Sequence, residues 1–169
     1  SRFMLVCAMN PCKCGWHGQP GGRCRCSEGE VKQYLGKLSG PLLDRVDLYV
    51  EVPALGFDEL SRRSQGERSS VIRARVEDAR ARQGARFGPD GPDCNAHMGP
   101  QEIQRFCPLD PAGQGIMRGA FQRLGLTARS YDRILRVART IADLDGAEEI
   151  QVPHLAEAVQ YRESSYFRR

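Results

Sequence analysis

The chain has 169 residues, of which 40% are hydrophobic and 27% are charged, and its formal net charge is +4 at pH 7. This composition is typical of a globular protein and excludes a collagen-like or an intrinsically disordered chain. No apolar run reaches the length of about 18 residues that a membrane-spanning helix needs, and we therefore expect no membrane partner.

The first predicted element is a strand. An uninterrupted apolar run from Phe3 to Met9 resembles a parallel strand that is buried on both faces. A second strand is predicted at 47–55, where apolar and polar residues alternate. Two strands are too few for a covered parallel sheet, and the chain begins with Ser-Arg rather than Met, so we expect the C-terminal part of a longer α/β protein. No G-x-x-x-x-G-K-[ST] loop occurs, which means that any nucleotide chemistry would be shared with residues outside this chain.

Two C-x-C pairs, separated by nine residues, follow the first strand: Cys12, Cys14, Cys24 and Cys26. Four thiolates saturate a tetrahedral zinc ion and can fix a loop that is too rich in glycine to form a core. Such a closed shell leaves no open coordination position, so we interpret the zinc as structural. Two disulfides or four unrelated thiols are the alternatives, and His17 is interpreted as a loop residue rather than a ligand.

The other cysteines bear on the compartment. Seven cysteines are an odd number, and the remaining three are far apart: Cys7, Cys94 and Cys107. This pattern favours reduced thiols over a secreted disulfide framework, and we expect a cytoplasmic protein.

Asn10 comes directly after the first predicted strand, at the end where open α/β sheets bind their ligands. Its amide could orient a water molecule or a phosphate oxygen. The alternative is an ordinary turn residue ahead of Pro11.

The rest of the chain is predicted to be helical. A helix is predicted at 70–87, with one face formed by Ile72, Val76, Ala79 and Gln83. Shorter helical pieces are predicted at 101–106 and 111–124. The clearest helix begins after Thr127, a suitable N-cap, and Gly146 can end it. A last helix begins near Pro153.

Three arginines of the helix after Thr127 lie opposite its apolar stripe on a 3.6-residue period: Arg129, Arg133 and Arg136. One face of this helix would therefore pack, and the other would present guanidinium groups. These groups could meet an anionic ligand, or they could form an ordinary solvated basic face.

Four stretches of the sequence resemble one family: "AMNPCKCG", "CRCS", "SGPLLDRVDLYVEVPAL" and "LTARSYDRILRVARTIADLDG". They are similar to the bacterial magnesium-chelatase-like AAA+ ATPases of the ComM/YifB type. The resemblance implies a mainly α protein with a small α/β part. Residues 1–56 would be the C-terminal part of an AAA+ core, with two strands and the zinc-binding insertion at 12–26. Residues 57–169 would be a helical lid.

The resemblance also implies roles for three residues. Asn10 would be the sensor-1 amide that helps to align the attacking water. Arg45 would be the arginine finger that reaches a neighbouring subunit's ATP, although by itself it could equally form a surface ion pair with Asp44 or Asp47. Arg129 would be the sensor-2 arginine that touches the nucleotide.

The implied activity is that of a hexameric ring motor, which hydrolyses ATP with Mg²⁺ and promotes branch migration of DNA in natural transformation. Branched or single-stranded DNA would be the partner. This chain lacks Walker A and B motifs and is expected to be inactive alone. A metal-chelatase motor and a non-catalytic, zinc-stabilised interaction module are the alternatives.

Overall fold

A computed structural model describes residues 3–57, 61 and 66–163. The described chain is mainly helical, as predicted. Its helices are α1 (Glu28–Leu35), α2 (Gly40–Leu43), α4 (Ser69–Phe87), the short 3₁₀ helix η1 (Asn95–His97), α5 (Pro100–Phe106), α6 (Pro111–Leu124), α7 (Ala128–Leu144) and α8 (Val152–Gln160). No helix among these described residues is long and apolar enough to cross a bilayer.

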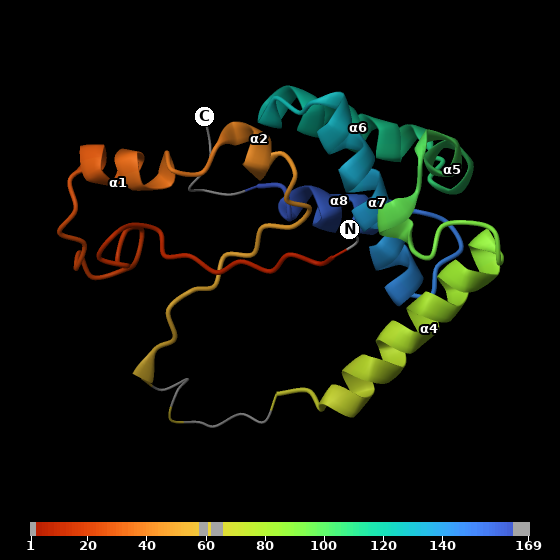
Figure 1. The fold of residues 1–169 in the computed structure, drawn as a ribbon, viewed down its shortest axis with the longest axis horizontal. Coiled ribbons are helices and arrows are strands. Elements are labelled where there is room, and N and C mark those ends of the chain that lie inside the picture. Colours follow the sequence, from red (N-terminus) through yellow and green to blue (C-terminus); the bar gives the residue numbers. More distant parts are fainter. Residues whose placement is uncertain (1–2, 58–60, 62–65, 164–169) are drawn as a thin grey trace.

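The C-terminal helices pack around α7, which contacts α4, η1, α5 and α8 (Figure 1). Thr127 caps α7 by accepting a hydrogen bond from the Ser130 N–H, as predicted. Gly146 follows the helix with φ 75°, a conformation that glycine adopts without strain. The apolar stripe of α7 is the centre of the core, where the buried residues include Ile134, Leu135, Ala138 and Ala142.

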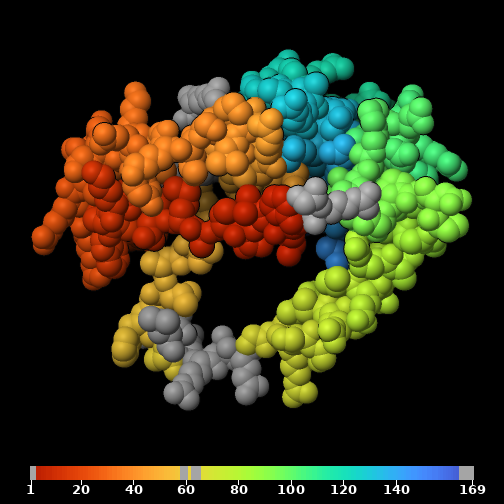
Figure 2. Space-filling model, viewed as in Figure 1, coloured from red at the N-terminus to blue at the C-terminus, as the bar shows by residue number. Residues whose placement is uncertain are grey.

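The apolar face predicted for α4 is buried only in part. Ala79 and Gln83 are buried, but Ile72 and Val76 remain exposed. The C-terminal half of α4 packs against the other helices, and its N-terminal half extends away from them, beside the open space visible in Figure 2.

Helices α1 and α2 were missed by the sequence reasoning. Ser27 caps α1, and the Glu30 carboxylate accepts a hydrogen bond from the Ser27 N–H in return, which completes a capping box. Ser39 caps α2 in front of Pro41. The S-x-x-E spacing at 27–30 is a signal that could have found α1.

The two predicted strands are not formed. Neither Phe3–Met9 nor 47–55 belongs to a strand, and Phe3 and Val50 are 77% and 69% exposed. An isolated extended segment gains stability only from neighbouring strands, and no other described segment offers one. The expectation of a buried first strand is therefore wrong for this chain.

Candidate metal centre and nucleotide-site residues

The four cysteines of the two C-x-C pairs converge, as the sequence predicts: their sulfur atoms all lie within 4.8 Å of one another. The Sγ–Sγ distances are 3.3 Å between Cys12 and Cys14, 3.8 Å between Cys12 and Cys24, and 3.6 Å between Cys14 and Cys24. All four thiols are free, so no disulfide holds the loop. His17 is not part of the group.

This arrangement fits a zinc ion. Four sulfur atoms at about 2.3 Å from a tetrahedral ion lie about 3.8 Å apart, close to the observed separations. The backbone N–H groups of Trp16 and Arg25 donate to the Cys14 sulfur and lower its pKa to about 6, so this thiol ionises readily at neutral pH. A zinc ion bound here would cross-link the loop, and its four thiolate ligands would leave no coordination position open.

Asn10 lies at the entrance of the cysteine loop and is exposed. Its side chain extends over the turn that follows Cys14: a Cβ added at Gly15 would lie 3.8 Å from the Asn10 Cγ. Within the described residues, no hydrogen bond joins Asn10 to Arg45 or to Arg129. The role of Asn10 as a sensor stays a prediction.

Arg45 follows α2 on a segment that is docked against α7. The Arg133 guanidinium donates to the Arg45 carbonyl oxygen at 2.5 Å and to the Asp47 carboxylate at 2.6 Å. The Arg45 side chain itself is exposed, and its Nη1 donates to the Pro41 carbonyl oxygen at 2.8 Å. Neither of the two predicted surface pairs is formed, and Asp47 pairs with Arg133 instead.

A second arginine strengthens this docking from the end of α8. Arg162 donates to the Val46 carbonyl oxygen, and its guanidinium lies 5.3 Å from the centre of the Tyr49 ring. The Tyr49 N–H donates to the Tyr161 carbonyl oxygen at 2.8 Å. Residues 45–49 are thus fixed to the C-terminal helices mainly through their backbone.

The arginine face of α7 is not uniform. Arg129 is exposed in the first turn, and its guanidinium has no hydrogen bond or ion pair within the described part of the chain. Arg136, two turns further on, donates to the Met98 carbonyl oxygen at 2.7 Å through Nη2. Arg133 and Arg136 therefore hold other segments in place, and only Arg129 remains available to a ligand.

Comparison with known proteins agrees with the sequence reasoning. Residues 66–162 match the family described as magnesium chelatase, subunit ChlI C-terminal, and residues 1–60 match magnesium chelatase, subunit ChlI. The chain belongs to this magnesium-chelatase ChlI family. It is therefore a member of the AAA+ class, of the ComM/YifB type that the sequence resembles.

Three relatives illustrate the similarity. The chain is 43% identical over 163 residues to competence protein ComM of Haemophilus influenzae and 42% identical over 163 residues to the uncharacterized protein YifB of Escherichia coli. Both alignments cover 96% of this chain and 31% of the relative. An uncharacterized protein of Mycobacterium bovis is 40% identical over 165 residues, 97% of this chain and 32% of that protein. The chain thus spans about a third of the length of these relatives.

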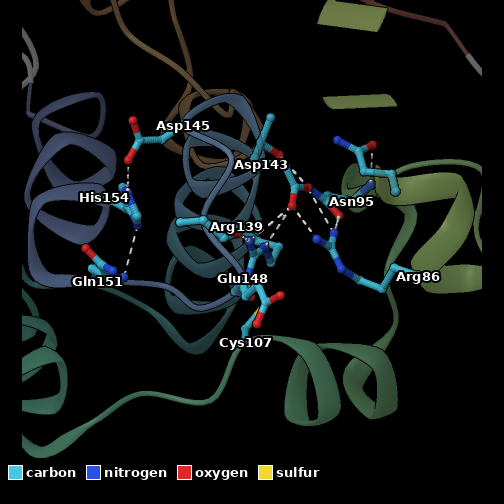
Figure 3. A network of polar contacts seen from close by, with 12 residues as sticks. Arg86, Asn95, Cys107, Arg139, Asp143, Asp145, Glu148, Gln151 and His154 are labelled. Atoms are coloured by element: carbon cyan, nitrogen blue, oxygen red, sulfur yellow. Dashed lines mark hydrogen bonds and ion pairs between the residues drawn. The ribbon is translucent and has the colours of Figure 1, made fainter. Parts of the chain in front are cut away.

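The ChlI-family helices also contain a buried polar network that the sequence reasoning missed (Figure 3). Asp143 accepts hydrogen bonds from Arg86 of α4, from Asn95 of η1 and from Arg139 of its own helix. Arg139 is only 2% exposed and also donates to the carbonyl oxygens of Ala147 and Glu148, both at 2.7 Å. The network therefore joins α4, η1, α7 and the connection to α8.

The charge of Asp143 is stabilised by its partners. Burial by itself raises the pKa of this carboxyl group, but the hydrogen bonds from Arg86 and Asn95, together with the positive charges of Arg139 and Arg86, hold the pKa below its usual value. The signal in the sequence is an Arg–Asp pair at i, i+4 beside the apolar stripe of α7. No predicted site residue belongs to this network, and we assign it to the stability of the ChlI-family domain.

Other clusters lie apart from the predicted site. Asp93, half-buried Cys94 and His97 form a group of three possible metal ligands beside η1. Burial raises the pKa of the Cys107 thiol to about 11, which makes it unreactive. A pocket of about 720 Å³ lies between α5, α6 and α7, and none of the predicted site residues lines it.

Proposed function

We propose that this chain is the C-terminal part of a cytoplasmic AAA+ motor that hydrolyses ATP with Mg²⁺ in a hexameric ring and promotes branch migration of DNA. The recombination of incoming strands in natural transformation would be its setting. The 43% identity to a competence protein over 96% of the chain supports this proposal. Residues 1–56 would complete the ATPase core, and residues 57–169 would be the helical lid.

The observation that carries the proposal is the contact between Arg133 and the backbone of Arg45. This contact couples the segment that bears the proposed finger to the helix that bears Arg129. A movement of α7 would therefore move Arg45 as well. Such coupling is what a motor needs if nucleotide state in one subunit is to alter the site of its neighbour.

The chemistry follows from the exposed guanidinium of Arg45. Placed against a neighbouring subunit's ATP, it would offset the charge that develops on the transferring phosphoryl group, an effect of about 10³–10⁵ in rate. Asn10 would help to align the attacking water, and Arg129 would contact the nucleotide from the helical side. The phosphate-binding loop and the Mg²⁺ ligands would come from residues outside this chain.

A metal-chelatase motor is the second candidate, because both matching families are described by the name of a magnesium chelatase subunit. The two candidates differ in what stimulates ATP hydrolysis. Branched DNA would stimulate the recombination motor, whereas a chelatase motor would ignore it. The four-cysteine loop favours the first candidate, since the resemblance that includes it is to ComM/YifB-type proteins.

The test is ATP hydrolysis by the full-length protein, with and without branched DNA. We expect DNA to stimulate turnover and Arg45→Ala to lower it by about 10³–10⁵-fold. Arg73→Ala is the matched control, because Arg73 is an exposed arginine of α4 whose pairing with Glu77 is fully at the surface. It should leave turnover unchanged.

Two results would overturn the proposal. Turnover that ignores DNA would favour the chelatase motor. Equal turnover in Arg45→Ala and the wild type would remove the finger, and the docked segment would then have a purely structural role.

A further inference from the structure

A hollow of about 530 Å³ opens beside the cysteine site. It is lined by Cys14, Trp16, Gly21, Gly22, Arg23 and Arg25. Because Cys14 is one of the four converging thiols, the wall of this hollow is attached directly to the metal centre. A bound metal ion would therefore hold the hollow in one shape.

Trp16 forms the aromatic wall and is 39% exposed. The Arg23 guanidinium lies 5.0 Å from the centre of its ring, in a cation–π arrangement that fixes both side chains on an otherwise glycine-rich loop. A restrained, partly exposed indole next to a guanidinium is the combination that binds unpaired nucleobases by stacking.

The glycines keep the opposite side of the hollow free. Gly21 and Gly22 have φ values of 95° and 61°, which only glycine adopts readily. A Cβ added at either position would meet nothing within 4 Å. The backbone turn needs these glycines, and the space beside them is open to a ligand.

Charge alone is too weak to define the ligand. Lys13, Arg23 and Arg25 are the only formally charged side chains from Met9 to Ser27. Four zinc-bound thiolates would carry a net charge of −2, so the loaded loop would have a net charge of only about +1. Glu30 lies close enough to Lys13 for the two charges to interact, which weakens the positive field further. Stacking must therefore supply most of the affinity.

This balance selects the form of the nucleic acid. The bases of a duplex are already stacked on each other, and their faces are closed to Trp16. Single strands offer free faces, and stacking on an aromatic side chain corresponds to about 5- to 150-fold in affinity per base. We propose that Trp16 stacks on an unpaired base of single-stranded DNA, while Arg23 and Arg25 contact the adjoining phosphates. The choice of DNA rests on the proposed function.

The test uses the zinc-loaded chain and a fluorescein-labelled oligothymidylate of twelve nucleotides. Trp16 is the single tryptophan of the sequence, so its fluorescence reports on this hollow alone. We expect the oligonucleotide to quench it. Trp16→Ala should weaken binding, measured by anisotropy, about 5- to 150-fold with unchanged zinc content, and Trp16→Phe should restore most of the affinity.

The phosphate contacts have their own readout. Arg25→Ala should weaken binding and lower the salt dependence by about one counterion, whereas Lys37→Ala, outside the hollow, should change neither. Equal quenching by inorganic polyphosphate would show a purely ionic site and overturn the inference.

The inference and the proposed function can fail separately. If the oligonucleotide binds without quenching and Trp16→Ala has no effect, DNA binds elsewhere, and only the inference is wrong. If nothing binds and DNA also leaves ATP hydrolysis of the full-length protein unchanged, both are wrong.

Discussion

From Asn10 to Ser27 only one side chain is buried, that of Cys12, whereas the helices from α5 to α8 surround a continuous apolar core. The cysteine loop brings its distant parts together through four thiols, and the helical domain does so through packing and one polar network. The contrast shows that two adjacent regions of one chain can depend on unrelated forces. Each should therefore fail under conditions that spare the other.

The largest expected effect is the loss of the metal. Cys24→Ser removes one of four thiolates from a site whose zinc affinity would correspond to about 10–16 kcal/mol. After exposure to chelator, the variant should retain less than about a tenth of an equivalent of zinc, and its circular dichroism should keep the helical signal. Cys94→Ser, which lies outside the site, should bind zinc normally. Loss of the helices together with the metal would contradict the independence of the two regions.

The converse change targets the buried network. Asp143→Ala leaves Arg86 and Arg139 without their shared carboxylate. We expect this to lower the free energy of unfolding of the helical domain, measured in urea, by about 3–5 kcal/mol. Asp145→Ala is the control, because that carboxylate is largely exposed beside His154 and should contribute at most about 1 kcal/mol. The zinc content should stay at one equivalent in both variants. Equal unfolding midpoints in Asp143→Ala and Asp145→Ala would show that the network does not stabilise the helices.

Substitutions at two glycines of α6 test its packing against α8. We expect them to change the stability of the protein in opposite directions, and by less than Asp143→Ala. A Cβ at Gly113 would lie 2.8 Å from the Leu155 Cδ1, so Gly113→Ala should cost about 1–3 kcal/mol. A Cβ at Gly115 would meet nothing within 4 Å, and Gly115→Ala on the same helix should stabilise by about 0.5–1 kcal/mol. The melting temperature should fall in Gly113→Ala and rise in Gly115→Ala. Shifts of the same sign would show that the contact with Leu155 does not decide the effect at Gly113.

The smallest effect concerns the junction between the two regions. Arg133→Ala removes the hydrogen bonds to Arg45 and Asp47, but the Asp47 side chain is 62% exposed, so the global loss should be only about 1 kcal/mol. Hydrogen exchange should nevertheless accelerate at the Tyr49 N–H, which is bonded to Tyr161. Arg129→Ala should leave that exchange unchanged.

The sequence predicted those elements whose signals are local. The boundaries of α6 and α7 follow from Pro111, Thr127 and the 3.6-residue period. The convergence of the four cysteines follows from residue type and spacing. The strands were wrong because their apolar residues require neighbouring strands that this chain does not supply.

Contacts between distant residues explain the other failures. Arg133 donates to the Arg45 carbonyl oxygen as well as to Asp47, and Arg136 donates to the Met98 carbonyl oxygen. No periodicity of α7 points to these partners. The Arg86–Asp143 pair likewise joins residues 57 positions apart. Helical spacing could identify which arginines share a face, but it could not decide which of them are already occupied.

Arg133 and Arg162 donate hydrogen bonds to the carbonyl oxygens of Arg45 and Val46 in the segment after α2. Every amino acid has such a carbonyl oxygen. The identity of the residue at position 45 is therefore free to vary without releasing the segment. An Arg45→Ala allele would therefore produce subunits that fold like the wild type and keep the segment after α2 docked against α7. Mixed with normal subunits, they would act as dominant-negative members of any assembly that depends on this side chain.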